Sequence, residues 1–599
     1  MDYQTCPNLA AMFFDWAAER GERPFLWAKR DGAYHAITWT EATRRVSMLA
    51  RGLRALGVKA GDRVALIAEN RPEWTIADLA IMTAGAITVP AYTTHTAEDF
   101  RHVLANSGAR GVIVSTASLA NRVMPAADQV STIASIITME PLTRGQLSHA
   151  EIYLWDDVMA RGAALPDEVA SWVKAMGRDD IACLIYTSGT GGVPKGVMTT
   201  HANILANCYG AFRLLETIGL GDDVFLCFLP LSHAYEHTAG MMFAISVGAE
   251  IYFAERAETL AANMPEARPT IMTAVPRLYE TLHQRIISGI ERQGGFRARL
   301  FRAAVDIGRK RYDHPETLTW RDRVLDVLLN LLVRRRIAAR FGGRLKAMVA
   351  GGAPLNPEIG RFFLALGVPL LQGYGQTEAS PVISVNPPKR IKIDTVGPPL
   401  EGVEVRIGED GEILARGPMV MKGYWNDPEA TARALADGWL HTGDIGEIDS
   451  DGYLRITDRK RDFIKNSGGD MVSPARVEGY LSLQPDIGQV MVHGDRRPYL
   501  VAVIVPAAEL LERRAGGRPS AAASDGADLI VDPELHKVLA AAVARVNAEL
   551  KPIERVRRFI IAAEPFTVAN GRMTPTLKIK RHAIRHAYGA ALQALYEAK

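Results

Sequence analysis

One short stretch concentrates groups that could bind phosphate. Residues 186–197 read YTSGTGGVPKGV, with hydroxyls on Thr187, Ser188 and Thr190 and a positive charge on Lys195. Glycines let consecutive backbone N–H groups approach one anion closely. The preceding apolar run IACLIY favours a buried strand, and α/β proteins bind phosphates where a strand ends. The stretch therefore predicts a phosphate loop, with a mobile surface loop as the plain alternative. It is not a Walker A loop, because a proline precedes the lysine and a glycine follows it.

Seven further motifs follow this loop in order. They are FLPLSHAYEHTAG (228–240), AVPRLYE (274–280), VAGGAPL (349–355), LQGYGQTEASPV (371–382), DGWLHTGDIG (437–446), TDRKRDFIKNSGGDMVSP (457–474) and NGRMTPTLKIKR (570–581). The series resembles the adenylate-forming superfamily of acyl-CoA synthetases, adenylation domains and luciferases. Within it the chain is most similar to long-chain fatty-acid–CoA ligases, and the resemblance covers nearly the whole sequence. It implies ATP and CoA as co-substrates, Mg²⁺ as cofactor, and acyl-AMP as intermediate.

The resemblance assigns the triphosphate to the loop and to the TE pair. Glu378 would bind the Mg²⁺ that bridges phosphate oxygens, and Thr377 would bond the α-phosphate. The residues assigned to the β- and γ-phosphates are Thr187, Ser188, Gly189, Thr190, Gly191, Gly192 and Lys195. The family's usual pattern is TSGTTG, and Gly191 stands where that pattern has its last threonine. That change removes one hydroxyl and predicts weaker handling of ATP.

The nucleoside and the acyl group would lie beyond the phosphates. The expected adenine slot comprises Gly351, Gly352, Ala353, Pro354, Tyr374 and Gly375. Asp444 would accept from the ribose hydroxyls, with Arg459 as second partner. His233, with Glu236 nearby, would lie beside the substrate carboxylate and the thioester channel. The alternative for His233 is a packed core histidine.

Three C-terminal features complete the implied machinery. Lys578 resembles the lysine that bridges the substrate carboxylate and the α-phosphate, although Lys580 and Arg581 are rivals by charge alone. Residues 459–461, including Lys460 and Arg461, resemble the hinge about which the small domain rotates between half-reactions. The expected CoA tunnel is lined by Ser467, Gly468 and Gly469.

Two other functions stay open beside the ligase. One is a fatty acyl-AMP ligase that loads a carrier protein, and the other is a catalytically weakened nucleotide- or acyl-binding regulator. The SGGD stretch favours CoA as acceptor, and Glu378, Asp444 and Lys578 favour an active enzyme. Acyl tunnels are apolar, so the sequence does not fix the chain length or unsaturation of the acid.

Elements of an α/β protein must position these residues. Up to about residue 460, short β-branched runs alternate with longer helical stretches, which is typical of parallel sheets flanked by helices. From 392 to 458, short strands and turns predict a small β-barrel-like subdomain. We therefore expect an N-terminal AMP-binding domain, 1–458, of parallel-sheet subdomains. A small, mobile α+β domain, 459–599, would follow it.

Bulk properties describe an ordinary intracellular enzyme. The chain has 599 residues, 48% hydrophobic and 23% charged, with a net charge of +3 that gives no argument for nucleic acid. The four cysteines show no metal or disulfide spacing. The N-terminus lacks the features of a signal peptide, and no apolar run is long enough to span a bilayer. We expect a cytoplasmic protein whose oligomeric state is open, a dimer being one option.

The helical segment 280–346 stands apart in charge. Residues 292–346 contain 15 Arg or Lys against 5 Asp or Glu, a net of +10. The helical segment between AVPRLYE and VAGGAPL is long, and in this it resembles the corresponding segment of long-chain enzymes. The cationic helices could simply be a solvated pair packed on the body. They could also contact an anionic membrane, at the inner face of the cytoplasmic membrane, as a peripheral protein.

Overall fold

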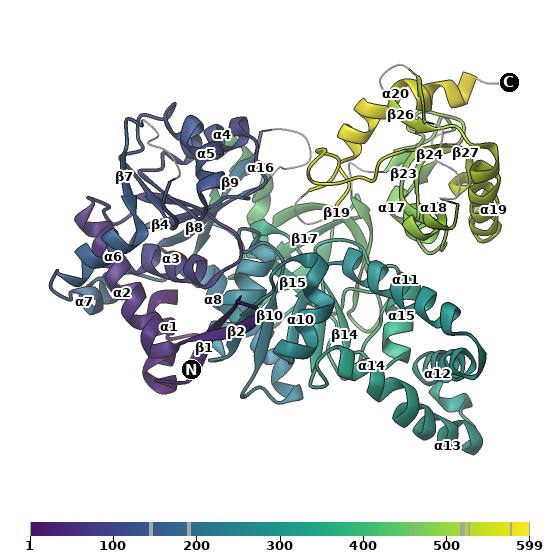
Figure 1. Ribbon diagram of the computed structural model, residues 1–599, viewed down its shortest axis with the longest axis horizontal. Coiled ribbons are helices and arrows are strands. Elements are labelled where there is room, and N and C mark those ends of the chain that lie inside the picture. Colours follow the sequence, from purple (N-terminus) through teal and green to yellow (C-terminus); the bar gives the residue numbers. More distant parts are fainter. Residues whose placement is uncertain are drawn as a thin grey trace.

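The chain folds into a large N-terminal region and a smaller C-terminal one (Figure 1). The computed structural model describes residues 2–142, 148–187, 193–459, 463–468, 470–514, 521–524, 527–574 and 578–597. The N-terminal region contains two eight-stranded sheets and one four-stranded sheet, and a three-stranded sheet forms the centre of the C-terminal region. The predicted fold class, α/β with a large domain followed by a small α+β domain, is confirmed.

The first eight-stranded sheet has the order β18-β9-β8-β4-β3-β5-β6-β7. Its strands are β3 (Arg63–Ile67), β4 (Ile87–Pro90), β5 (Gly111–Val114), β6 (Ser135–Thr138), β7 (Glu151–Leu154), β8 (Ile181–Thr187), β9 (Lys195–Thr200) and β18 (Gly423–Tyr424). Strands β3 to β8 pair in parallel, whereas β9 and β18 are antiparallel additions. Every residue of β4, β5 and β6 is buried, as expected for parallel strands covered on both faces.

Helices flank this sheet. They are α2 (Trp39–Ala55), α3 (Pro72–Thr83), α4 (Ala97–Ser107), α5 (Ala117–Ala127), α6 (Trp155–Ala163) and α7 (Val169–Ala175). Of these, α2, α4 and α5 each begin after a threonine whose hydroxyl accepts a backbone N–H. Helix α4 starts with a capping box, in which the Thr96 hydroxyl and the Asp99 carboxylate each accept a backbone N–H. Such caps satisfy backbone N–H groups that the first turn of a helix leaves without a partner.

The second eight-stranded sheet has the order β15-β14-β13-β12-β10-β11-β1-β2. Its strands are β1 (Pro24–Arg30), β2 (Ala33–Thr38), β10 (Val224–Cys227), β11 (Glu250–Phe253), β12 (Ile271–Ala274), β13 (Ala347–Ala350), β14 (Leu370–Gly375) and β15 (Val382–Val385). Strands β10, β12, β13 and β14 are successive parallel neighbours. Their carboxyl ends therefore meet at one edge of the sheet, where such folds bind ligands.

One hydrophobic core joins the two large sheets. It includes Trp39, Trp74 and Phe225, each at most 1% exposed. The helices around the second sheet are α1 (Leu9–Arg20), α8 (His201–Leu215), α9 (Phe243–Ser246), α10 (Leu260–Ala267) and α15 (Pro357–Ala365). A π-helical turn, Glu236–Met242, precedes α9. Turns of this kind are frequent near functional sites.

A helical segment separates β12 from β13. It comprises α11 (Pro276–Gln293), α12 (Gly295–Asp313), α13 (Trp320–Leu329), a π-helical turn (Asn330–Arg334) and α14 (Arg335–Arg340). Figure 1 shows α12 and α13 at the lower right end of the molecule. Among the described residues, no helix combines the length and apolarity needed to cross a membrane.

The four-stranded sheet lies between the large sheets and the C-terminal region. Its antiparallel strands are β16 (Glu404–Ile407), β17 (Glu412–Arg416), β19 (Leu440–Ile448) and β20 (Leu454–Arg459). Between β17 and β19 the chain returns to the first sheet as β18, and then forms α16 (Pro428–Ala434). Through β18, the segment between β17 and β19 pairs with β9, the strand that follows the predicted phosphate loop.

The C-terminal region has hydrophobic cores of its own. Its sheet consists of β23 (Ile487–His493), β24 (Leu500–Pro506) and β27 (Val556–Ile561). The remaining elements are β21 (Ile464–Lys465), β22 (Met471–Val472), α17 (Pro474–Leu481), α18 (Ala508–Arg514), β25 (Ala521–Ser524), β26 (Ala527–Ile530), α19 (Pro533–Glu549) and α20 (Arg581–Glu597). Its two buried clusters are drawn entirely from residues beyond 463. The boundary at 458 and the hinge stay predictions.

Candidate active site

The predicted adenine and ribose residues gather at the carboxyl edge of the second sheet. The Tyr374 hydroxyl, at the end of β14, donates to Asp444 Oδ2 over 2.6 Å. Tyr374 is 8% exposed and Asp444 is 5% exposed, so the pair is almost closed to water. Asp444 lies directly across from Arg459 in the β19–β20 pairing, which brings the expected ribose partners together along the backbone. The side chain of Arg459 lies outside the described part of the chain.

The GGAP motif follows the neighbouring strand β13 at the same edge. Gly351 packs against Tyr235, where an added Cβ would come within 2.9 Å of the ring. Gly352 has a φ of +79°, which disfavours any other residue. Gly375 is equally restricted, because a Cβ there would lie 1.8 Å from the Pro381 carbonyl oxygen. The glycines thus let the backbone pack closely against its neighbours. Ala353 and Pro354 continue the motif toward solvent.

Glu378 is held by a tyrosine of β18, the strand that joins the first sheet. The Tyr424 hydroxyl donates to Glu378 Oε1 over 2.8 Å, and the Met421 N–H donates to the Glu378 carbonyl over 2.9 Å. Burial, and then the Glu378 charge, raise the pKa of Tyr424 well above its usual range, so the hydroxyl stays a donor. Thr377 begins the same short turn, Thr377–Ala379.

Lys195 contacts Tyr424, the residue that holds Glu378, and the nearby Asp427. Its Nζ lies 3.1 Å from Asp427 Oδ2 and 5.2 Å from the centre of the Tyr424 ring. The Ala430 N–H, and then Lys195, lower the pKa of Asp427. Thr187 and Lys195 face each other across the β8–β9 pairing, and so close the hairpin that carries the predicted phosphate loop. Loop residues Ser188, Gly189, Thr190, Gly191 and Gly192 lie outside the described residues.

The donor set around Glu378 suits Mg²⁺ bound together with a nucleotide. Mg²⁺ commonly binds through one or two carboxylates plus substrate phosphates. Glu378 supplies one carboxylate, oriented by Tyr424, beside the hairpin that would hold the phosphates. Among the described residues, no group of three or more His, Cys, Asp or Glu side chains could hold a metal ion.

His233 lies where the C-terminal region reaches the N-terminal one. The Tyr235 N–H donates to His233 Nδ1 over 3.1 Å, which places the proton of the neutral ring on Nε2. Burial, and then the positive charge of Lys578, lower the pKa of His233 to about 3. His233 is therefore a neutral donor at physiological pH. The ring of Tyr92 packs 6.5 Å away.

Lys580 and Arg581, the two other candidate cations, interact with residues other than His233. Burial lowers the pKa of His95 to about 4, with Lys580 acting in the same direction against the opposing charge of Asp99. Arg581 forms two hydrogen bonds to Glu478, of 2.6 and 2.5 Å, inside the C-terminal region.

Two hydrogen bonds join Lys578 to Thr574. The Lys578 N–H donates to the Thr574 hydroxyl over 3.0 Å, and the Thr574 N–H donates to the Lys578 carbonyl over 2.7 Å. Of the three cations, Lys578 is thus the one whose charge acts on His233. Its catalytic role stays a prediction.

The predicted CoA residues lie within the C-terminal region. The Ser467 N–H donates to the Arg497 carbonyl over 3.0 Å, and Gly468 lies beside Asn466 and Asp470. These described contacts do not reach His233 or Lys578. Gly469, Lys460 and Arg461 are outside the described residues, so the tunnel and hinge assignments stay predictions.

The structure adds residues that sequence reasoning missed. Tyr424 and Asp427 contact Glu378 and Lys195 from a segment, MKGYWND, that none of the eight motifs includes. The sequence does carry a local signal there, a Gly-Tyr pair followed by an Asp-Pro helix start. Its place beside Glu378 and Lys195 could not be predicted, because the pairing of β18 with β9 joins residues more than 200 positions apart. Glu236 differs from expectation too, since it is wholly buried and accepts from the Thr273 hydroxyl over 2.5 Å.

Comparison with known proteins identifies the class. The AMP-binding enzyme family matches residues 13–425, and the AMP-binding enzyme C-terminal domain matches residues 461–599. The chain therefore belongs to the AMP-binding enzymes.

Individual relatives are similar along nearly their whole length. The long-chain-fatty-acid–CoA ligase FadD15 of Mycobacterium tuberculosis is 34% identical over 98% of this chain and 97% of its own. Long-chain-fatty-acid–CoA ligase 6 of Homo sapiens is 31% identical over 96% and 85%. The solved A domain of carboxylic acid reductase from Segniliparus rugosus has a TM-score of 0.77 at 23% identity, covering 99% and 95%, which shows a shared fold.

Proposed function

We propose that the protein is a long-chain fatty-acid–CoA ligase that forms AMP. It would convert a fatty acid and ATP to acyl-AMP and diphosphate, and then transfer the acyl group to CoA. Membership of the AMP-binding enzymes and full-length similarity to ligases of this name support the proposal. The geometric observation that carries it is the Tyr374–Asp444 hydrogen bond at the sheet edge, and the charge of Lys578 acts on His233.

In the first half-reaction, a carboxylate oxygen of the fatty acid attacks the α-phosphorus of ATP. The bond from that phosphorus to the bridging oxygen breaks, and diphosphate leaves with the electron pair. Lys578 would neutralise the negative charge that builds between the two anions, since positioned cations contribute most where charge develops. Thr377 would bond the α-phosphate, and Thr187, Lys195 and the loop between them would hold the leaving group.

The nucleotide is positioned by the remaining edge residues. Asp444 would accept from the ribose hydroxyls, while the Tyr374 hydroxyl fixes its carboxylate in place. The glycines of GGAP and GYG would admit the adenine ring. Mg²⁺ at Glu378 would neutralise phosphate charge when bound, and Tyr424 keeps that carboxylate oriented. Each positioned group lowers the cost of assembling the reactants.

In the second half-reaction, the CoA sulfur attacks the acyl carbonyl carbon after losing its proton. A carbon–sulfur bond forms, the bond from carbon to the phosphate oxygen breaks, and AMP leaves. We propose that domain 459–599 rotates about residues 459–461 between the steps. The rotation would withdraw Lys578 and bring Ser467, Gly468 and Gly469 toward the acyl-AMP. Neutral His233, with its proton on Nε2, would donate to the substrate beside this path.

A chain-length series tests the proposal directly. Purified protein with ATP and Mg²⁺ is given acids from acetate to long saturated and monounsaturated chains, and release of AMP and diphosphate is measured with and without CoA. We expect the fastest AMP release with about a dozen carbons or more, because each buried CH₂ contributes about 0.8 kcal/mol. Preference for acetate, an aryl acid or an amino acid contradicts it. Acyl-AMP formation that CoA never turns over indicates a carrier-loading enzyme, and no acid-dependent diphosphate indicates a regulator.

We also propose a cytoplasmic location with peripheral contact to an anionic membrane through segment 280–346. All four cysteines are unpaired thiols and buried, which suits a reducing compartment. The cationic character of the segment supports the membrane contact. Fractionation of cells into cytosol, washed membrane and salt extract tests it. Most of the protein should leave the membrane with salt.

A further inference from the structure

An apolar stripe is turned toward solvent on α13 and the π-helical turn that follows it. Its members are Trp320 (71% exposed), Val327 (62%), Val324 (55%), Leu328 (49%), Leu332 (47%), Leu331 (45%) and Leu325 (39%). The spacing of residues 320, 324, 327, 328 and 331 places them on one face of a helix. We call these seven residues the apolar stripe. Continuous exposed apolar surface of this kind usually marks an interaction site.

The opposite face of the same helix is firmly packed on α12. Leu329 is fully buried in a cluster with Ala304 and Ile307. Arg334 is 3% exposed and donates to the carbonyls of Ala365 over 2.8 Å and Ala304 over 3.0 Å. These contacts fix the rotation of the helix about its axis. The outward position of the apolar stripe is therefore a property of the fold.

The acidic residues of this helix also face inward. Asp322 lies 2.8 Å from the Lys310 ammonium, and Asp326 lies 3.0 Å from Arg311 and 2.6 Å from Arg334. Both carboxylates are thereby neutralised on the side that contacts α12. The outer face keeps no acidic side chain that would repel an anionic surface.

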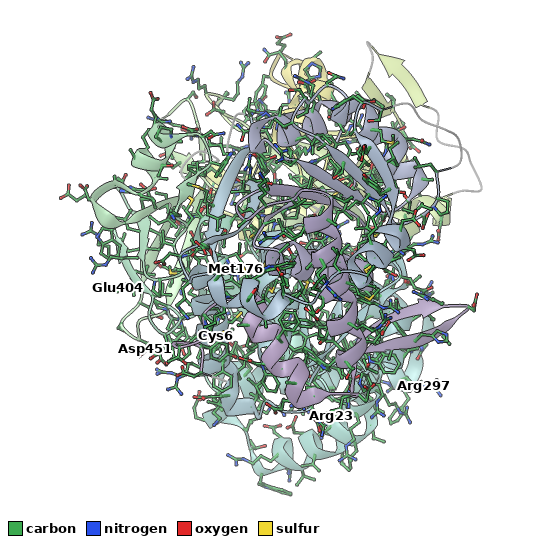
Figure 2. The ribbon with its side chains drawn as sticks, turned by 90° about the vertical axis from the view of Figure 1, so that its left-hand side faces the viewer. Cys6, Arg23, Met176, Arg297, Glu404 and Asp451 are labelled. Atoms are coloured by element: carbon green, nitrogen blue, oxygen red, sulfur yellow. The ribbon has the colours of Figure 1, made fainter. Side chains whose placement is uncertain are left out.

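Arginines border the apolar stripe at both ends. Arg321, Arg323, Arg335, Arg336 and Arg340 are all exposed. No ion pair joins any of them to an acidic group among the described residues, whereas Arg334 is buried and paired. Figure 2 shows Arg297, near the start of α12, at the periphery of the molecule. The outer surface thus combines apolar side chains in the middle with unneutralised guanidinium groups around them.

We propose that the apolar stripe and its bordering arginines dock on an anionic lipid bilayer, with Trp320 and the aliphatic side chains entering the headgroup–acyl boundary. Amphipathic helices bind membranes through this combination of apolar area and cationic border. Tryptophan is favoured at such boundaries because its ring is partly polar. The proposal specifies the surface and depth of the membrane contact suggested above, and its test needs no ligase activity.

Vesicle flotation with matched variants tests the surface. The full-length protein is mixed with vesicles of equal phosphatidylglycerol and phosphatidylcholine, or of phosphatidylcholine alone. We expect binding to the anionic vesicles and release by high salt, which screens exposed charges. The variant Val327→Ser/Leu331→Ser should lose most binding. Val531→Ser, which alters an equally exposed valine (64%) in the C-terminal region, should bind as the unmodified protein does.

A second double variant tests the arginines that border the apolar stripe. Each arginine near an anionic surface contributes about five-fold in affinity, so Arg335→Gln/Arg336→Gln should bind roughly 30-fold more weakly. Because all four altered side chains of the two variants are exposed, their thermal unfolding should match that of the unmodified protein.

Insertion is measured through Trp320. Lipids brominated on their acyl chains quench a tryptophan that enters the boundary. Binding of the unmodified protein should quench its fluorescence, and Trp320→Phe should still bind while losing most of that quenching. Three results would overturn the proposal: equal binding to neutral and anionic vesicles, undiminished binding of the double serine variant, or quenching that Trp320→Phe leaves unchanged. A dimer in sedimentation that the serine variant abolishes, without vesicle binding, would assign the surface to a second copy of the chain.

Discussion

Two groups of acidic and aromatic residues lie close together in this fold but differ in their access to solvent. At the sheet edge, Asp444 is bonded by Tyr374 and Glu378 by Tyr424, with Glu378 still partly exposed. Beneath His233, the π-helical turn carries Glu236 and His237 into the core. Both are 0% exposed.

The partners in the buried group are equally enclosed. His237 Nε2 lies 2.9 Å from Asp78 Oδ2, and neither side chain is exposed. Glu236 accepts from Thr273, and its carboxyl fills the space beside Gly240, where a Cβ would lie 2.7 Å from the carboxyl carbon. Burial raises the pKa of Glu236 to about 7. A carboxyl that is about half protonated near pH 7 and closed to solvent is a poor ligand for Mg²⁺.

Residue type and spacing therefore do not by themselves identify a site. His233, Glu236 and His237 occur within one heptapeptide, LSHAYEH, yet only His233 faces the C-terminal region. The π-helical turn begins at Glu236 and rotates the following side chains inward. We therefore interpret Asp444 and Glu378, at the sheet edge, as substrate-binding residues, and Glu236 and His237, in the core, as structural residues.

Lys578→Ala should separate the two half-reactions. Removing a cation that acts where charge develops costs about 3–4 kcal/mol, so acid-dependent diphosphate release should fall by about 100-fold or more. Conversion of supplied acyl-AMP and CoA to acyl-CoA should survive, since that step uses the rotated domain. Both rates are measured on one preparation, with Lys580→Ala as the neighbouring control.

The two variants together also test the register of the C-terminal end. Retained adenylation in Lys578→Ala with loss in Lys580→Ala would show that the wrong lysine is assigned. Equal loss of both half-reactions in a well-folded Lys578→Ala protein would contradict domain rotation.

Glu236→Gln should change the pH dependence of stability. The folded carboxyl has a pKa of about 7 against an ordinary value of 4.5, so the folded state binds the proton more tightly. Its contribution is fully present below pH 4.5 and is lost as pH rises toward 7 and beyond. The loss approaches about 3 kcal/mol. Thermal unfolding of both proteins between pH 5 and 8 measures it. Relative to the glutamine variant, the unmodified protein should become steadily less stable.

Exposed Glu429→Gln supplies the control for this profile, because it alters a glutamate that is 86% exposed. It should leave the profile unchanged. If Glu236→Gln instead abolishes adenylation and keeps the pH profile of the unmodified protein, the buried group belongs to the active site and the distinction drawn above is wrong.

Tyr424→Phe should weaken use of Mg²⁺ by about 10-fold. Groups that orient a metal ligand typically contribute 10- to 100-fold to affinity, and the Tyr424 hydroxyl is 2.8 Å from Glu378. The Mg²⁺ concentration for half-maximal diphosphate release, at constant ATP, measures the effect. Tyr453→Phe removes a comparable hydroxyl, bonded to the Arg390 carbonyl, and should change nothing. An unaltered Mg²⁺ requirement in Tyr424→Phe would indicate that Glu378 is not the ligand.

The sequence predicted the edge residues well where local rules sufficed. Parallel strands end at one edge, so GGAP after β13 is a neighbour of GYG at the end of β14 and of the QTE that follows it. The contribution of Tyr424 could not be foreseen, because it depends on which distant segment extends the first sheet. The rotation of Glu236 into the core likewise depends on an extra residue in one helical turn, which apolar periodicity does not encode.

Gly191→Thr should produce the smallest effect. Position 191 lies outside the described residues, and the expectation rests on the family's usual TSGTTG pattern. A restored hydroxyl would add about one hydrogen bond near the β- and γ-phosphates, worth about 1 kcal/mol or less, so ATP affinity should improve by up to about five-fold. Competition by ATP against a fluorescent nucleotide measures this without turnover. Gly221→Thr is the control, since nothing lies within 4 Å of a Cβ there. Unchanged or weaker ATP binding in Gly191→Thr would mean that the backbone donors already satisfy the phosphates, or that the side chain does not fit.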